Sequence, residues 1–346
     1  MADAEEYVDR AAGRIVEVLD EQHAVVNPEL QARISEAGRR GSGLNIDPHH
    51  VTTALRRLSV SGIVVTQRST TRGGREIVTF RLGNVTRRET KIEKATQRKR
   101  VLMARYQGWS QGTKRHPHGT IGPAGEAAVR SAILAAGSLV PAAPGAGEVA
   151  ALLGTPLRGP VDSAGYMVPI LKGLPQSPVT VLFEVKNLRS WIYPSSIELY
   201  QLLHKAAVLQ RARPDELITG ILICRRAHPT LYWMAGQLGF AVIEMDTQFA
   251  GSVDSDALDE VRVALNFADL RVGAGPSLRV RDRLALGSGL VQGIADSATN
   301  WRATALNDRF ATPIAAIRRT TKDSDRLALV DRLRARAVAE GHRGGW

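Results

Sequence analysis

The chain is poor in several residue types, and each shortage excludes a class of protein. Cys224 is the only cysteine among 346 residues, which excludes an internal disulfide and a zinc site built from several cysteines. Aromatic residues make up 5% of the chain, and no apolar run approaches the roughly 18 residues that a membrane-spanning helix needs. The acidic start, residues 1–6, lacks the apolar segment of a signal peptide. We therefore expect a cytoplasmic protein without membrane contact, long enough for two or three domains.

Lysine is also scarce, with 8 lysines beside 38 arginines, yet the net charge is +12 and the isoelectric point is near 10.3. A positive surface attracts phosphate backbones, although an arginine-rich composition also follows from genomic base composition. The charge is uneven, because residues 87–115 carry ten Lys and Arg against Glu89 and Glu93. This segment is either a solvated linker helix or a surface that contacts phosphates, and the sequence leaves both open.

The first 85 residues have the pattern of a small helical unit closed by a hairpin. Apolar residues recur at helical spacing over 5–21, and further helices are expected from Asn27 and Asp47, each followed by proline. Residues 63–70 and 75–82 alternate as two strands around a glycine-rich turn.

Three helices followed by a basic hairpin resemble a winged helix-turn-helix domain. The resemblance is architectural, without a specific motif, and implies that the third helix enters a groove of duplex DNA while the hairpin touches the backbone. The residues then expected to contact DNA are Thr52, Thr53, Arg56 and Arg57 on the helix and Arg68, Arg72 and Arg75 on the hairpin. Binding to a protein, or simple packing, is the alternative role for such a unit.

Beyond a basic connector at 86–119, strands alternate with helices over 120–250, and 251–346 is mostly helical. A strand broken near Asp162 is followed by an apolar strand at 179–186. The alternation predicts an α/β fold, in which a mixed β-sheet is flanked by helices on both faces.

The apolar strand ends in Glu184-Val185-Lys186. An acid-x-Lys tripeptide is weak evidence, since roughly 0.8 matches are expected by chance, and Glu89-Thr90-Lys91 is a second one. The setting is more informative, because residues i and i+2 of a strand share one side and buried charges need a partner or a metal. A plain salt bridge at the strand end is the simplest alternative.

The order of Glu126 on a helix, Asp162 at a strand break, then Glu184 and Lys186 resembles the PD-(D/E)xK nuclease superfamily, over about residues 120–246. The resemblance implies that Asp162 and Glu184 hold Mg²⁺, with Mn²⁺ as a substitute, and that the Val185 carbonyl is a further ligand. The ion polarises the scissile phosphate and activates a water molecule. Lys186 would orient this water, and Glu126 would complete the site.

The chain departs from the family pattern at two places. Pro160 is separated from Asp162 by one residue, and Gln201, which matches a glutamine of some branches, is followed four residues later by Lys205 in place of tyrosine. Simpler interpretations remain: Asp162 forms a turn, Glu126 favours the helix dipole in a first turn, and Gln201 is solvated.

Two further groups are expected to be structural or solvated. On the helix after the strand, His204 and Lys205 are expected to be solvent-exposed more often than to face DNA. In the loop after the strand, Asn187, Arg189 and Trp191 could contact substrate, but a structural role is the commoner one for such residues.

Together these features predict an Mg²⁺-dependent DNA endonuclease for restriction, phage defence or repair, acting on duplex DNA. A homodimer is expected if both strands are cut, because each chain has one site. A DNA-binding regulator or adaptor, with an inactive nuclease-like domain used for dimerisation or sensing, is the alternative. A nuclease for RNA or DNA junctions is a third.

Overall fold

The computed structural model describes residues 4–36, 46–71, 73–84, 88–113, 117–273 and 275–340. The chain forms two compact units, one of Met1–Thr120 with Ser252–Val272 and the other of Ile121–Gly251 with Gly273–Trp346. The segment predicted as a connector thus belongs to the first unit, as does part of the region predicted as a separate helical end. Within the described ranges, no helix has the length and apolar character needed to cross a membrane.

The first unit contains the predicted helices and hairpin. Its elements are α1 (Ala4–Gln22), β1 (Val25–Val26), α2 (Asn27–Ser35), α3 (Pro48–Val60), β2 (Val64–Thr70) and β3 (Glu76–Leu82). The strands pair antiparallel in the order β1-β3-β2. Asp47 caps α3, because its carboxylate accepts a hydrogen bond from the His49 backbone N–H at 3.1 Å and Pro48 follows it.

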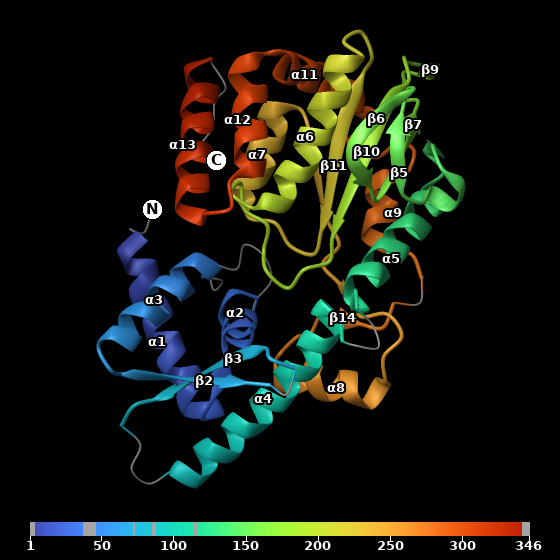
Figure 1. Ribbon diagram of the computed structural model, residues 1–346. Helices are drawn as coiled ribbons and strands as arrows, with labels where there is room; N and C mark the ends of the chain where they lie inside the picture. The colour runs from blue at the N-terminus through green and yellow to red at the C-terminus, as the bar shows by residue number, and fades with distance from the viewer. Residues whose placement is uncertain are drawn as a thin grey trace. The chain divides into compact units, whose positions relative to one another are not determined.

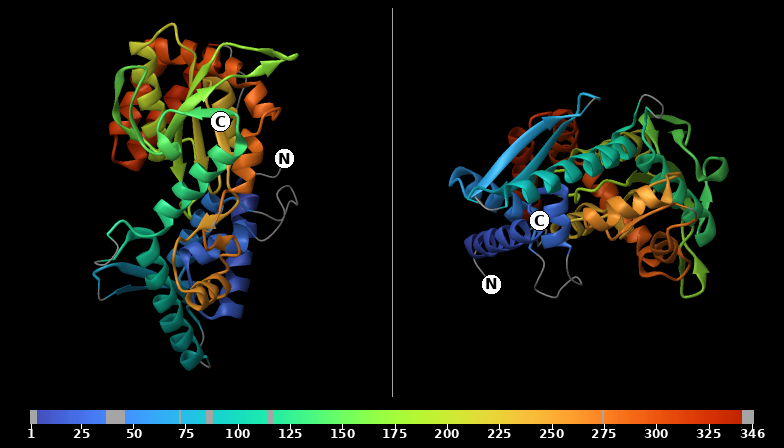
Figure 2. Two further views of the ribbon diagram at one scale, coloured as in Figure 1. Left: turned by 90° about the vertical axis from the view of Figure 1, so that its right-hand side faces the viewer. Right: turned by 90° about the horizontal axis from the view of Figure 1, so that it is seen from below.

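The long helix α4 (Glu89–Gln111) continues this unit, together with α8 (Ser255–Ala264) and β14 (Leu270–Arg271) (Figures 1 and 2). One of its basic residues, Lys99, is buried, so it belongs to neither a solvated face nor a phosphate-binding surface. Its Nζ atom lies 2.5 Å from Glu29 Oε1 and 2.6 Å from the Ala264 carbonyl oxygen. Because Lys99 is buried, its ammonium group needs these partners, since an unpaired charge in the interior would be costly.

The second unit is built on a five-stranded mixed sheet in the order β12-β11-β10-β7-β4 (Figure 1). The strands are β4 (Leu139–Pro141), β7 (Ser163–Met167), β10 (Val179–Lys186), β11 (Ile218–Cys224) and β12 (Ala241–Glu244). Strands β10, β11 and β12 run parallel, whereas β7 pairs antiparallel with both β10 and β4. The predicted mixed sheet is therefore confirmed.

Helices cover both faces of this sheet, as predicted. One face packs against α5 (Ile121–Ala136), α9 (Leu278–Leu284) and α10 (Gly289–Gln292). The other packs against α6 (Ile197–Ala212), α7 (Pro229–Leu238), α12 (Asp308–Arg319) and α13 (Asp323–Ala339), and α11 (Ile294–Leu306) contributes to both. Along β10, Phe183 and Val185 face α5, and Leu182 faces α6. Glu184 and Lys186 therefore lie on the α6 face, because strand side chains alternate.

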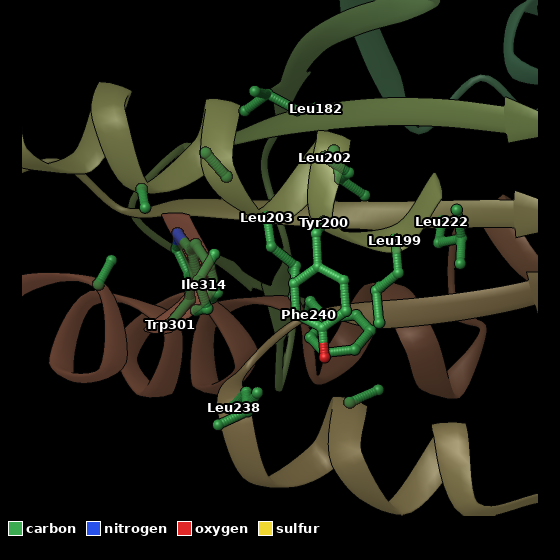
Figure 3. Close-up of a cluster of buried hydrophobic side chains, with 14 of the residues drawn as sticks. Leu182, Leu199, Tyr200, Leu202, Leu203, Leu222, Leu238, Phe240, Trp301 and Ile314 are labelled. Carbon is green, nitrogen blue, oxygen red and sulfur yellow. The ribbon is translucent and has the colours of Figure 1, made fainter. Parts of the chain in front are cut away.

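Helix α6 is fixed by a large apolar cluster (Figure 3). Tyr200 and Leu203 of α6 are fully buried together with Trp301 and Phe240 from other elements. The Tyr200 hydroxyl donates to the Pro194 carbonyl at 2.7 Å, so its one polar group is satisfied. This packing gives the polar residues of α6 a defined position beside the sheet.

Short strands surround the main sheet, and only β6 (Thr155–Val161) among them was predicted, as the first part of the strand broken near Asp162. The others are β5 (Val149–Leu152), β8 (Ile170–Leu171), β9 (Leu174–Pro175) and β13 (Gln248–Phe249), and a 3₁₀ turn lies at Pro144–Ala146. The β8–β9 hairpin, light green in Figure 2, extends from the body of this unit. Strand β6 contains Pro156 and Pro160, which confine it to an edge and weaken its pattern in the sequence.

Candidate active site

Asp162 lies at the break between β6 and β7, as the sequence predicted. The pairing of β7 with β10 ends at Ser163 and Phe183, and β10 continues beyond it. There the Asp162 Oδ2 atom accepts a hydrogen bond from the Val185 N–H at 2.6 Å. Because the N–H and C=O of one strand residue point to the same side, the Val185 carbonyl faces this edge too. The Asp162 carboxylate is thereby held against the end of β10.

Glu184 is buried, at 4% exposure, and both of its carboxylate oxygens are bonded to lysines. Oε1 lies 2.9 Å from Lys186 Nζ, and Oε2 lies 2.9 Å from Lys205 Nζ. The prediction that Glu184 and Lys186 share one side of the strand is confirmed. The salt bridge named as the simplest alternative is also present, so the function depends on what surrounds this pair.

The expectation that Lys205 is solvent-exposed is wrong. It is only 7% exposed, and besides Glu184 its ammonium bonds the Pro160 carbonyl oxygen at 2.6 Å. The cause is β6, which lies along α6 and has Gly159 in a conformation with φ of +105° beside the lysine stem. The signal available in the sequence was that Lys205 follows Gln201 by one helical turn, on the same side of the helix.

Glu126 belongs to α5 but lies beyond its first turn, since the helix already begins at Ile121. Its Oε2 atom is 3.0 Å from Arg130 Nη2, and about a third of its side chain is exposed (32%). Arg130 also donates through Nε to the Asp162 carbonyl oxygen at 3.4 Å. Arg130, which the sequence did not single out, therefore connects the glutamate of the helix to the strand break.

Burial first, and like charge second, raise the pKa of two carboxyl groups of the site. Burial and then the charge of Glu184 raise the pKa of Asp162. Burial and then the charge of Asp162 raise the pKa of Glu126, and the exposed Glu148 adds to this effect. Glu148 precedes β5, whose Val149 pairs with Val161, and no sequence pattern had singled it out.

The same negative charge acts on Lys186 and favours its protonated form. Burial alone lowers its pKa, but the charge of Glu184 and a hydrogen bond to it outweigh burial, so that the pKa of Lys186 is raised. Asp162 and Glu198 contribute in the same direction. Lys186 is therefore a protonated ammonium group in surroundings that are rich in negative charge.

The residues present fit a hard divalent cation by the chemistry of their donor atoms, although in the described part of the chain the carboxylates of Asp162, Glu184 and Glu126 are not gathered within 4.8 Å of one another. Asp162, Glu184 and Glu126 offer carboxylate oxygens, and the Val185 carbonyl faces the same edge of the strand. Oxygen donors of this kind suit Mg²⁺ and Mn²⁺. Burial is the larger cause of the raised pKa values of Asp162 and Glu126, and the neighbouring carboxylates are the second cause, which a cation would offset.

Gln201 lies on α6 one turn before Lys205 and is partly buried. Its side chain has no hydrogen-bond partner among the residues that the structure describes. Its place in the site remains a prediction that rests on the resemblance alone. Glu198, on the same helix, acts electrostatically on Lys186 and was not singled out from the sequence.

Asn187 has a structural role that also orders the site. Its Nδ2 atom donates to the carbonyl oxygens of Ile121 at 2.6 Å and Phe249 at 2.8 Å. A Cβ atom on Gly125 would lie 2.4 Å from Asn187 Cβ, so only glycine permits this approach. The contact joins the start of α5 to the end of β10, and so holds Glu126 near Lys186.

In the first unit, the residues of α3 expected to meet DNA are all exposed. The hydroxyl groups of Thr52 and Thr53 donate back to carbonyl oxygens of their own helix, four residues earlier. Arg57 pairs with Glu5 at 2.5 Å and also with Asp9, both on α1. Its charge is thus partly neutralised, whereas Arg56 has no such pair in the described part of the chain.

On the hairpin, Arg68 Nη1 lies 3.0 Å from Glu76 Oε1 across the two strands. Arg75 donates to the Gly112 carbonyl oxygen at the end of α4. Arg72 lies outside the residues that the structure describes. These contacts leave DNA binding by the hairpin as a prediction, with two of its arginines already engaged within the protein.

Comparisons of the chain with protein-family models, with curated proteins and with solved structures found no match. The geometry of the acidic cluster and the fold of each unit, taken by itself, are therefore the basis for any functional conclusion.

Proposed function

We propose that the protein is an Mg²⁺-dependent endonuclease that hydrolyses phosphodiester bonds of duplex DNA, of the PD-(D/E)xK kind. The observation that carries the proposal is the position of the Asp162 carboxylate on the N–H of Val185, between Glu184 and Lys186. A strand-break aspartate, a buried strand-end glutamate and a lysine two residues later thus share the end of one strand.

A salt bridge alone would not explain the composition of this cluster. Four carboxylates, Glu126, Glu148, Asp162 and Glu184, are coupled electrostatically around two lysines and one arginine. Two of the acids have raised pKa values, which means that their ionised forms are destabilised where they stand. A divalent cation would relieve this cost, and such strained titratable groups are typical of functional sites.

The residues of the chain have separate roles in the proposed reaction. Asp162 and Glu184, with Glu126 and the Val185 carbonyl, would hold the ion. When bound, Mg²⁺ polarises the scissile phosphate and lowers the pKa of a water molecule. Lys186 has a raised pKa and is protonated at neutral pH, so it stabilises negative charge on the phosphate and orients the water, and does not serve as a general base.

Lys205 acts as a positioning residue in this scheme. Its ammonium bonds both the Glu184 carboxylate on β10 and the Pro160 carbonyl on β6, two residues before Asp162. It therefore fixes the distance between the strands that supply the two principal acids. The matching position in the nuclease branch with glutamine and tyrosine is an aromatic residue, so Lys205 sets this site apart from that branch.

The first unit supports the DNA part of the proposal. Its order of helix, short strand, two helices and hairpin is that of a winged helix-turn-helix domain. We infer that it positions duplex DNA for the second unit, with the exposed Arg56 as its clearest candidate contact. A role in restriction, phage defence or repair, and a homodimer for cutting both strands, complete the proposal.

The test is incubation of supercoiled plasmid with the full chain and Mg²⁺. Wild type should nick or linearise the plasmid, and chelation should stop it. Asp162→Asn and Lys186→Ala should each reduce the rate by about 100-fold or more, as expected for losing a metal ligand or a charge stabiliser. The matched control is Lys91→Ala, in the exposed second acid-x-Lys tripeptide, which should cleave at the wild-type rate.

Unchanged cleavage in both site variants would contradict the assignment of the site. If wild type cleaves neither plasmid, RNA nor branched DNA but still binds duplex DNA, the regulator or adaptor alternative replaces the nuclease proposal.

A further inference from the structure

A second group of charged residues lies on α6, the helix that carries Lys205, and on the elements that pack against it. Helix α6 packs between β6 and α12. His204, half-buried, stands next to Lys205 on this helix. Arg158 comes from β6, and Arg318 and Arg319 come from the last turn of α12. Three elements distant in the sequence therefore bring basic groups to one place.

All three arginines act electrostatically on His204. Burial lowers its pKa first, and Arg318, Arg158 and Arg319 lower it further. Across the described part of the second unit, only arginines act on this ring, and no acidic side chain offsets them. The imidazole is thus surrounded by positive charge from both neighbouring elements.

These three arginines differ from the arginines of the same unit that are paired with carboxylates. Arg211 pairs with Asp308, Arg326 pairs with Asp323, and Arg309 lies 3.5 Å from Glu340. By contrast, Arg158, Arg318 and Arg319 have no carboxylate partner within residues 117–273 and 275–340, and Arg158 and Arg319 are exposed. Like charges placed together without counter-ions are unfavourable, and an anion that bridges them would relieve the repulsion.

We propose that Arg158, Arg318 and Arg319, grouped around His204, form a phosphate-binding surface that holds the backbone of the nucleic acid beside the acidic cluster. Guanidinium groups suit this role because their paired N–H donors match phosphate oxygens. We call these three residues the α6 arginine surface. The inference rests on the proposed function, and it names a contact between that site and its substrate.

Residues of this second group are close in sequence to residues of the acidic cluster. His204 precedes Lys205, whose ammonium bonds Glu184, and Arg158 lies four residues before Asp162. DNA presents one phosphate per 3.4 Å along each strand, so a backbone that crosses the acidic cluster can continue over the α6 arginine surface. We therefore expect the three arginines to contact successive phosphates of one strand and not a single isolated anion.

The test measures equilibrium binding of a fluorescein-labelled duplex to the full chain by anisotropy, from 50 to 200 mM salt and without divalent metal. The variant Arg158→Gln/Arg318→Gln/Arg319→Gln is compared with wild type. Each lost phosphate contact should reduce the slope of log K against log salt by about 0.9, so the slope should fall by about 2.7. Arg158→Gln alone should reduce it by about 0.9.

The matched control is Arg283→Gln/Arg332→Gln/Arg334→Gln, which removes the same charge from exposed positions of the same unit. Its slope should stay at the wild-type value. The proposal is overturned if the first triple variant keeps the wild-type slope, or if the control lowers the slope equally. Because this binding assay contains no metal, its result does not depend on cleavage. A protein that shows the slope change here but does not cleave plasmid in the separate assay with Mg²⁺ would contradict the nuclease proposal and support the α6 arginine surface.

Discussion

Each of the two compact units contains a buried glutamate held between two basic side chains, and the two groups differ in their balance of charge. In the first unit Glu29 lies 2.8 Å from Arg33 and 2.5 Å from Lys99, and Lys99 also donates to the Ala264 carbonyl. Burial lowers the pKa of Lys99 in spite of Glu29. Two cations share one carboxylate here, and the group is a closed structural contact between α2, α4 and α8.

The corresponding group in the second unit has an excess of acid. Glu184 is also bonded to two lysines, but Asp162 and Glu126 lie within electrostatic range, and the pKa of both is raised. Lys186 has a raised pKa where Lys99 has a lowered one. The two lysine shifts have opposite directions, in line with the cation site that we propose at Glu184, and the first group leaves Glu29 Oε2 buried without a hydrogen-bond partner among the described residues. A buried salt bridge by itself is therefore no evidence for function.

The largest expected effect is a difference in the free energy of unfolding lost when each of the two glutamates is replaced. Glu29→Gln leaves Lys99 and Arg33 against a neutral amide and should reduce the free energy of unfolding by about 3–5 kcal/mol. Glu184→Gln should cost clearly less, because Asp162 and Glu126 remain to compensate its two lysines. Urea denaturation, with hydrogen exchange to locate the affected unit, provides the measurement. Equal losses of unfolding free energy in the two variants would show that Asp162 and Glu126 do not compensate the two lysines beside Glu184.

A smaller effect concerns Mg²⁺ and pH. At about 100 times its dissociation constant, Mg²⁺ should stabilise the folded protein by about 2.7 kcal/mol. Binding needs ionised carboxylates, and burial with like charge raises the pKa of Asp162 and Glu126. The stabilisation by Mg²⁺ should therefore be lost as pH falls through these raised pKa values, at a higher pH than ordinary carboxyl groups would give. Thermal melting with and without Mg²⁺ across pH measures it.

Without metal, the carboxyl groups of Asp162 and Glu126 change the stability of the protein with pH in the opposite direction. Between the unfolded and the raised folded pKa, the folded protein binds more protons than the unfolded chain. Their contribution to stability is present below the unfolded pKa and is lost as pH rises through the folded pKa. Asp162→Asn is the control, because its amide oxygen can still accept from Val185 but carries no charge. This variant should show a weaker pH dependence and no stabilisation by Mg²⁺, and a wild-type response from it would exclude Asp162 as a ligand.

Much of the second unit could be predicted from local patterns. The strand at Val179–Lys186 is an apolar run of the right length, and its alternation placed Glu184 and Lys186 on one face. The break at Asp162 and the end of α5 before Gly137, with φ of +67°, also follow from local backbone chemistry. These features depend on neighbouring residues alone, so a single sequence contains them.

The features that were missed depend on contacts between distant segments. Lys205 is buried only because β6, a proline-containing strand without an alternating pattern, covers α6. Arg57 lies on the polar side of its helix as predicted, but Glu5 and Asp9 reach it from another helix. Helical periodicity indicates which side of a helix is apolar, and it cannot indicate which charged partner the fold brings to the polar side.

The most direct test of the central claim is a crystal structure of the full chain with Mn²⁺, located by its anomalous scattering. We expect an anomalous peak at about 2.1 Å from carboxylate oxygens of both Asp162 and Glu184, with at least one lysine displaced from Glu184. A structure with Mn²⁺ in the crystal, no peak at these residues, and both lysines still on Glu184 would contradict the account.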